Sequence, residues 1–180
     1  MKLFIASDIH GSKYYAEKLK ERFIQEGADM MALLGDIYYH GPRNPLPKDY
    51  APMEVAKILN GMKDKLIVVK GNCDSEVDQM ISEFSFTESA KILVDNVVVT
   101  LTHGHKFNKD IMPEFPGDVL AYGHFHVNFM ERVGNTLVVN PGSVSLPKEN
   151  AVHGYIIIEN NFVSQFDIEG NLIEKQKIKE

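Results

Sequence analysis

The first half of the chain alternates short apolar runs with amphipathic segments, and each apolar run stops at a polar motif. Leu3–Ala6, Met30–Leu34 and Lys65–Val69 are predicted to be buried strands. Between them, Tyr14–Glu26 carries apolar residues at helical spacing, and Met53–Met62 is predicted to be a short helix. The order strand–helix–strand–helix–strand predicts a parallel sheet with right-handed crossovers.

The second half of the chain is richer in strands. Hairpins are predicted to turn at Asp95-Asn96, Gly134-Asn135 and Asn160-Asn161. Gly170-Asn171 leads into a last predicted strand near Leu172–Ile178. No flexible linker separates the two halves, so we expect one domain over residues 1–180, with two sheets packed on each other.

Composition limits the classes of protein to which the chain can belong. A net charge of −6 argues against a protein that binds long nucleic acid by neutralising many phosphates. Cys73 is the single cysteine, so no internal disulfide can form. The apolar start of the chain ends at Asp8, too early for a signal peptide, and no run approaches the roughly 20 apolar residues of a membrane span. We expect a cytoplasmic protein with no membrane partner.

Five polar motifs occur in order, most of them directly after an apolar run. They are Asp8-x-His10, Gly35-Asp36, Gly71-Asn72-Cys73-Asp74, His103-Gly104-His105 and Gly123-His124-Phe125-His126. One such motif alone is more often a turn or a helix cap. However, carboxylate, amide and imidazole groups bind divalent metals, and functional groups gather at the carboxyl ends of strands in open α/β sheets. Five motifs in order therefore predict one metal centre assembled from five loops.

This order of motifs resembles the calcineurin-like metallophosphoesterase superfamily, whose pattern is Asp-x-His, Gly-Asp, Gly-Asn-His-Asp/Glu, His and Gly-His-x-His. The resemblance covers Asp8–His126. The finer similarity is to the small YfcE-like phosphodiesterases, in the runs Gly-Asn-Cys-Asp-Ser-Glu, Thr-His-Gly-His and Asn140-Pro141-Gly142-Ser143. It implies a four-layer αββα sandwich, in which two mixed β-sheets are flanked by helices.

The resemblance also implies ligands for two divalent metal ions. The first ion would be held by Asp8, His10, Asp36 and His126. The second would be held by Asp36, Asn72, His103 and His124, with Asp36 bridging the two. The resemblance favours Mn²⁺. Fe²⁺, Zn²⁺, Co²⁺ and Ni²⁺ are the alternatives, because mixed nitrogen and oxygen donors suit these ions better than Mg²⁺ or Ca²⁺.

Cys73 stands where the superfamily has a histidine assigned to leaving-group protonation or transition-state stabilisation. By resemblance, Cys73, His105 and Asp36 are the catalytic candidates, and Asn72 and His105 are the candidates for substrate binding. For Cys73 the alternative is a small side chain that only fills space.

The activity implied is that of a metal-dependent phosphodiesterase, which hydrolyses a small phosphodiester with a metal-bridging hydroxide as nucleophile. Phosphomonoesterase activity and a non-catalytic protein-binding scaffold of the same fold are the alternatives. A DNA nuclease ranks lower, because the chain has no basic patch.

The loops Tyr38–Pro52 and Lys106–Gly117 are expected to shape the substrate site. The basic residues expected to be available for substrate contact are Arg43, Lys48, Lys106 and Lys109. A homodimer or homotetramer is expected from apolar loop residues predicted to be exposed, namely Tyr38, Tyr39, Leu46 and Tyr50. His40 and His153 lie outside the motifs and are interpreted as ordinary surface or loop histidines.

Overall fold

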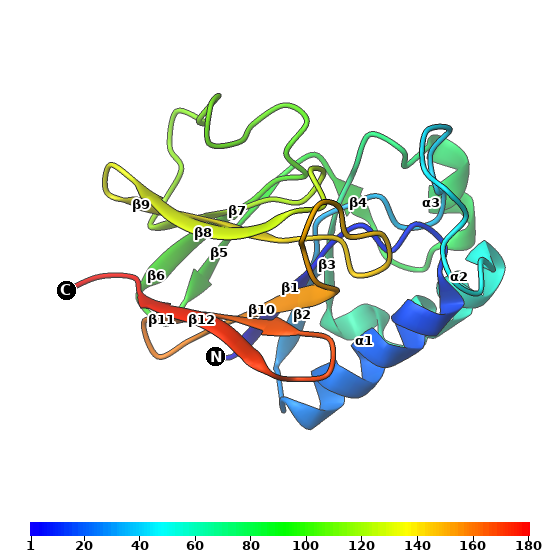
Figure 1. The fold of residues 1–180 in the computed structure, drawn as a ribbon, viewed down its shortest axis with the longest axis horizontal. Coiled ribbons are helices and arrows are strands. Elements are labelled where there is room, and N and C mark those ends of the chain that lie inside the picture. The colour runs from blue at the N-terminus through cyan, green and yellow to red at the C-terminus, as the bar shows by residue number, and fades with distance from the viewer.

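The computed structural model describes residues 1–180, and its first three strands lie side by side in parallel (Figure 1). They are β1 (Leu3–Ala6), β2 (Met30–Leu33) and β3 (Leu66–Val69), close to the predicted runs. The connections between them contain α1 (Lys13–Gln25) and α2 (Pro52–Asn60), as predicted. Continuous apolar runs are typical of parallel strands that are covered on both faces.

The C-terminal part of the chain completes the same sheet. β10 (Gly154–Glu159) pairs antiparallel with β1, and β11 (Phe162–Asp167) and β12 (Leu172–Lys177) follow outward. At the other edge, β4 (Phe86–Thr87) pairs in parallel with β3. The order of this seven-stranded sheet is β12-β11-β10-β1-β2-β3-β4, so the first strand of the chain lies in its middle.

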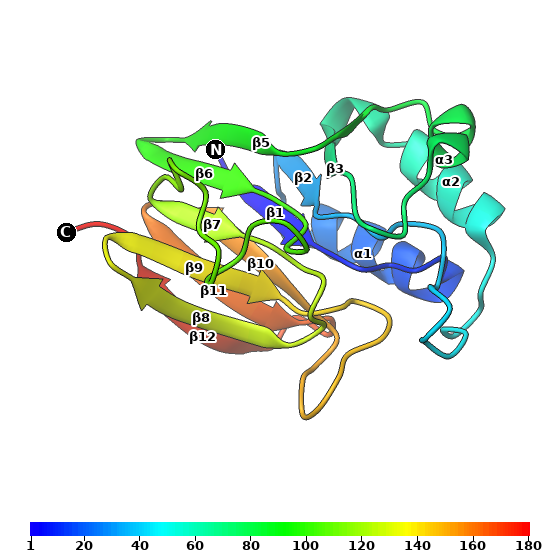
Figure 2. The same ribbon diagram turned by 90° about the horizontal axis from the view of Figure 1, so that it is seen from above.

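A second, five-stranded sheet faces the first (Figure 2). Its strands are β5 (Ala90–Val94), β6 (Val97–Leu101), β7 (Val119–Ala121), β8 (Asn128–Val133) and β9 (Thr136–Pro141). Its order is β5-β6-β7-β9-β8, with β6, β7 and β9 parallel and the two edge strands antiparallel to them. The predicted hairpins at Asp95-Asn96 and Gly134-Asn135 are confirmed, and Asp95 and Gly134 adopt the positive φ that such tight turns need.

Alternation along β1 divides the core in two. Leu3 and Ile5 point between the sheets, where they pack with Val99, Leu101 and other buried aliphatic side chains. Phe4 points the other way, toward the helices. Each face of the first strand therefore contributes to a different core.

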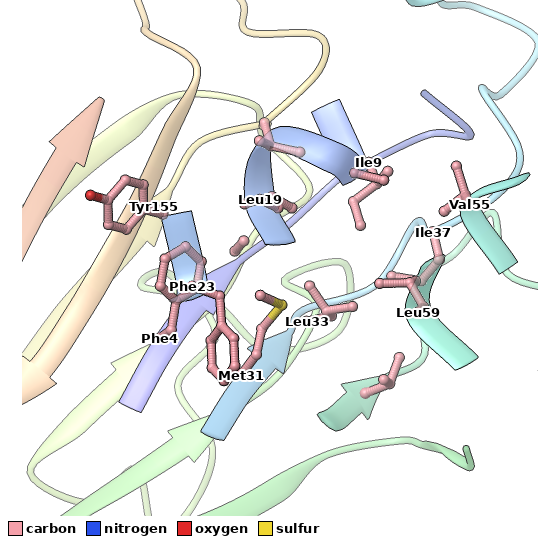
Figure 3. Close-up of a cluster of buried hydrophobic side chains, with 14 of the residues drawn as sticks. Phe4, Ile9, Leu19, Phe23, Met31, Leu33, Ile37, Val55, Leu59 and Tyr155 are labelled. Carbon is pink, nitrogen blue, oxygen red and sulfur yellow. The ribbon is translucent and has the colours of Figure 1, made fainter. Parts of the chain in front are cut away.

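Helices α1 and α2 cover the outer face of the seven-stranded sheet (Figure 3). Phe4 stacks on Tyr155, with ring centroids 4.5 Å apart, and meets the edge of Phe23 from α1 at 6.1 Å. The helix begins where it does because the Ser12 side chain accepts a hydrogen bond from the Tyr15 N–H.

The prediction of two mixed sheets flanked by helices is confirmed, with one difference in the outer layer. The outer face of the five-stranded sheet is covered by the loop after β6, where Met112 packs on Leu120, Tyr122 and Val138. Two short elements were not predicted, the helix α3 (Glu76–Ile81) and the strand β4. None of the helices combines the length and apolar character that crossing a membrane requires.

Candidate metal centre

The two sheets bring the predicted motifs together at the carboxyl ends of their parallel strands. Asp8 follows β1, Asp36 follows β2, Asn72 follows β3, His103 follows β6 and His124 follows β7. In Figure 2 the loops after β1, β2 and β3 run out on the side of the molecule that carries α1, α2 and α3. Ligand atoms of Asp8, Asp36 and His103 lie within 4.8 Å of one another, although they come from both sheets.

Asp8, His10 and His126 form a first group of convergent donor atoms. Asp8 Oδ1 lies 3.2 Å from His126 Nε2 and 3.5 Å from His10 Nε2, and the two Nε2 atoms are 3.1 Å apart. Asp8 Oδ1 is buried and accepts no hydrogen bond. Burying a carboxylate oxygen without a hydrogen-bond partner lowers the stability of the folded protein. A cation bound between these three side chains would satisfy this oxygen.

Asp36, Asn72 and His103 form a second group. His103 Nε2 lies 3.0 Å from Asn72 Oδ1 and 3.4 Å from Asp36 Oδ1. The other oxygen, Asp36 Oδ2, lies 3.8 Å from His10 Nε2 in the first group. The carboxylate of Asp36 therefore lies between the two groups, with one oxygen facing each.

Backbone carbonyls hold three of the imidazole rings in place. His10 Nδ1 donates to Tyr39 O at 2.7 Å, His103 Nδ1 to Leu34 O at 2.6 Å, and His126 Nδ1 to Leu146 O at 2.7 Å. A carbonyl oxygen can only accept, so each Nδ1 carries a proton and each ring turns its Nε2 toward the site, where it can bind a metal once that nitrogen has no proton. This is how metal-binding histidines are oriented.

Five of the candidate ligands have a left-handed backbone conformation. Their φ angles are 58° at Asp8, 50° at His10, 55° at Asp36, 66° at His124 and 62° at His126. Such residues cost on the order of 1 kcal/mol or more each, and they persist only where the surroundings hold them. The backbone at Asp8 is held by Ser143 and Ser145, whose hydroxyls donate hydrogen bonds to the Asp8 carbonyl at 2.8 and 3.0 Å. The strain is concentrated where the donor atoms converge.

Asp74 ties two of the loops together, a role that the sequence analysis did not assign. Its carboxylate accepts hydrogen bonds from the backbone N–H groups of Asp36 at 2.8 Å, Ile37 at 2.8 Å and Gly71 at 2.7 Å. Burial raises the pKa of Asp74 to about 6, although these three donors act in the opposite direction. The sequence offered one clue to this role, because the motif Gly71-Asn72-Cys73-Asp74 ends in a carboxylate.

The site carries an excess of buried negative charge. Burial raises the pKa of Asp8, but the nearby imidazoles of His10 and His126 outweigh it and hold that pKa well below its usual range. Burial lowers the pKa of His103, but Asp36 and Asp8 outweigh it and raise the pKa to about 9. Negative charge strong enough to keep a proton on a buried imidazole fits a cation-binding site.

His124 and His105 lie on one side of His103, with ring centroids 5.1 and 5.3 Å from its ring. Burial and the charge of His103 lower the pKa of His124 to about 4, so its ring stays neutral near pH 7. His105 is exposed and borders a separate small cavity with Glu88 and Lys106. Its catalytic and substrate-binding roles stay predictions.

Cys73 contributes its backbone as well as its side chain. The Cys73 N–H donates to Asp36 Oδ1 at 2.8 Å and so orients the carboxylate between the two groups. The half-buried thiol lines the main cavity. Burial, together with the negative charge of Asp36, raises the pKa of the Cys73 thiol to about 12.

A cavity of about 580 Å³ opens beside the convergent donor atoms. Its lining residues are Asp36, Tyr39, Gly41, Pro42, Arg43, Asn44, Asn72, Cys73, His124, His126 and Lys148. Five of them come from the predicted loop Tyr38–Pro52, whereas the predicted loop Lys106–Gly117 contributes none.

Only one of the four predicted basic contacts, Arg43, lines this cavity. Lys48 lies over the ring of Tyr14, with its Nζ 3.4 Å from the ring centroid. Lys106 pairs with Glu88 at 2.5 Å, and Lys109 pairs with Glu131 at 3.2 Å. Lys148, which the sequence analysis did not select, takes their place in the lining.

The expected apolar surface of the loop Tyr38–Pro52 is only partly present. Tyr39 and Leu46 are exposed, but Tyr50 is half-buried and Tyr38 is buried, with its hydroxyl 2.7 Å from Ser82 Oγ. The prediction for Tyr38 was wrong because its ring packs with the helix-side core.

The two histidines outside the motifs also have defined surroundings. The His153 ring stacks on Tyr15, and the His40 ring packs between Tyr39 and Tyr50. Neither histidine lines the main cavity.

Comparison with known proteins links this arrangement to one family. The family model for the calcineurin-like phosphoesterase superfamily domain matches residues 1–161. Phosphodiesterase YfcE of Escherichia coli K12 is 46% identical over 166 residues, which cover 91% of this chain and 90% of that protein. The structure of YfcE from E. coli superposes with a TM-score of 0.95 at 42% identity, over 99% of this chain and 100% of that one. Vps29 from Chaetomium thermophilum shares the fold, with a TM-score of 0.68 at 15% identity over 99% of this chain and 98% of that one.

Replacing Gly71 by alanine tests how tightly Asp36 is held. A Cβ at Gly71 would lie well inside van der Waals contact of Asp36 Oδ1 and of the Asp36 backbone nitrogen. We expect Gly71→Ala to displace the carboxylate and to lower the bound metal per chain at least several-fold, measured by elemental analysis. Gly61→Ala is the control, because the nearest atom to its Cβ would be 3.4 Å away. Full metal content in Gly71→Ala would contradict the assigned position of Asp36.

The pKa of His103 predicts how metal affinity depends on pH. A metal binds the neutral imidazole, so at any pH below about 9 the proton on His103 must leave first. Apparent affinity for Mn²⁺ should therefore rise with pH, by up to about tenfold per unit, and level off above that pKa. Calorimetry in buffers of different ionisation enthalpy should detect the released proton near pH 7. The release should become smaller in His103→Asn, where His10 is a remaining ligand with a raised pKa, but should be unchanged in His153→Asn. A pH-independent affinity would refute the assignment.

Proposed function

Because the chain belongs to the calcineurin-like phosphoesterase superfamily, we propose that it is a metal-dependent phosphodiesterase that hydrolyses a small phosphodiester at this centre. The observation that carries the proposal is the position of Asp36, whose two oxygens face two different groups of donor atoms. A carboxylate in that position suits a bridge between two divalent ions. We also propose that residues 1–180 act as one domain.

We assign the ligands of the two ions as follows. Asp8, His10, Asp36 and His126 would hold the first ion, and Asp36, Asn72, His103 and His124 the second. The set combines imidazole nitrogens with carboxylate and amide oxygens, which suits Mn²⁺, Fe²⁺, Zn²⁺, Co²⁺ or Ni²⁺, and we propose Mn²⁺. Two such ions would lower the pKa of a bound water and neutralise charge on the phosphoryl oxygens.

The protein's own hydrogen bonds hold the candidate ligands in place. The Cys73 N–H and the Asp74 carboxylate hold the Asp36 loop, and carbonyls hold the imidazoles, so little reorganisation remains when substrate arrives. The cavity leaves room for the ester arms beside His124 and Asn72. Only two of its eleven lining residues are hydrophobic, which favours a polar substrate over a lipid.

Hydrolysis of bis(p-nitrophenyl) phosphate with added Mn²⁺ tests the proposal. Turnover that EDTA removes and Mn²⁺ restores is the expected result. Faster turnover of p-nitrophenyl phosphate than of the diester would instead support a phosphomonoesterase. No turnover of either ester with any of the five metals would support a non-catalytic scaffold.

Asp36→Asn tests the bridge directly. Losing one carboxylate shared by both ions should reduce metal content at both sites and lower kcat by about a hundredfold or more, measured by elemental analysis and steady-state kinetics. Asp64→Asn, at an exposed position away from the site, should retain both metals and full activity. Two tightly bound metals per chain and normal turnover in Asp36→Asn would rule out the shared-ligand assignment.

The useful form of Cys73 beside a phosphoryl group is the neutral thiol, and burial favours that form by raising the pKa of the thiol. If Cys73 donates a proton to the leaving oxygen, Cys73→Ser should keep much of the rate. Cys73→Ala should then lose more rate on the ester with the poorer leaving group. The measurement is kcat on two diesters whose leaving groups differ in pKa. Equal losses on both esters would leave Cys73 as a packing residue.

A further inference from the structure

The cavity beside the metal centre also contains two cations that the assigned mechanism does not use. Arg43 and Lys148 line it together with Asp36, Asn72 and His124. Neither side chain forms an ion pair or a hydrogen bond with any part of the chain, and both are exposed. By contrast, Lys106 and Lys109 are both paired with glutamates. Two unpaired cations in one cavity of a chain with net charge −6 favour an anionic ligand there.

The backbone at both cations is held by hydrogen bonds. Lys148 N–H donates to the carbonyl of His126 at 3.0 Å, which ties its loop to a proposed ligand. Arg43 lies in a turn closed by Asn44, whose N–H donates to Gly41 O at 3.3 Å and whose side chain donates to His40 O at 2.8 Å. The two side chains approach the same cavity from loops far apart in the sequence, so both can reach one ligand.

The charge of a simple diester does not account for them. Two divalent ions carry four positive charges, whereas Asp8 and Asp36 supply two negative ones, and an attacking hydroxide supplies a third. The single charge of a phosphodiester then balances the two ions, and the carboxylate of Asp74, buried beside Asp36, adds one further negative charge. Arg43 and Lys148 together exceed that charge by one, and guanidinium and ammonium groups are well suited to a phosphate.

We propose that the natural substrate carries a second phosphate group on one ester arm, and that Arg43 and Lys148 bind it. This inference rests on the proposed phosphodiesterase function. A cavity of about 580 Å³ is large enough for a nucleotide-sized diester, and its mostly polar lining suits a substrate with two anionic groups.

A matched pair of esters tests the inference, namely the p-nitrophenyl ester of thymidine 5′-phosphate with and without a 3′-phosphate. The parent enzyme with Mn²⁺ should show a kcat/KM roughly tenfold higher for the ester that carries the 3′-phosphate. In the double variant Arg43→Gln/Lys148→Gln this ratio should fall to about one, mainly through KM. Lys109→Gln, which removes a lysine outside the cavity, should keep the ratio of the parent.

Binding provides a readout that does not depend on turnover. Calorimetry with thymidine 3′,5′-bisphosphate against thymidine 5′-phosphate should show tighter binding of the bisphosphate, and the double variant should lose that difference. If the parent cleaves both esters with equal kcat/KM, the inference is wrong while the proposed function stands. If neither ester is cleaved, the proposed function fails, and calorimetry alone decides whether Arg43 and Lys148 bind a phosphate.

Discussion

The carboxylate of Asp36 lies between two groups of donor atoms, and most of the site is arranged with reference to it. One oxygen faces His103 and accepts the Cys73 N–H, while the other faces His10. The backbone N–H of the same residue is held by Asp74. Loops from both sheets are therefore positioned by one buried anion. The surroundings have a low dielectric. Removing the Asp36 carboxylate would leave the polar groups that face it buried without a partner, so the loss would destabilise more of the site than its direct contacts.

Burial of charge and backbone strain occur at the same place. The chain buries Asp8 with an unpaired oxygen, and it holds both aspartates and three histidines of the site at positive φ. These features lower the stability of the protein and persist because Ser143, Ser145 and backbone carbonyls hold the segments rigidly. The same rigidity keeps donor atoms in place before any ligand binds, as a precise binding site requires.

Local patterns in the sequence were enough to predict the parallel strands, the hairpins and the convergence of the motifs. Each of these depends on a periodicity or a turn chemistry that acts over a few residues. The residues that were missed depend on contacts between distant segments. Asp74 matters because its carboxylate reaches the loop after β2, and Lys148 because its loop is hydrogen-bonded to His126. Tyr38 was expected at the surface because it lies in a loop, but its ring packs in the core with residues of α2 and with Phe86 of β4. The packing of Tyr38 is set by the whole fold and leaves no short signature in the sequence.

The order of strands in the larger sheet has a consequence for how the protein is made. β1 is synthesised first, yet one of its two neighbours, β10, begins only at Gly154. On the ribosome, the edge of β1 that accepts β10 therefore stays unpaired until Gly154–Glu159 has emerged. The loop that carries Asp8 leaves this strand, and the serines that hold its carbonyl come at positions 143 and 145. The centre can thus be completed only after these serines and β10 have emerged, which delays tight metal capture until both sheets can form.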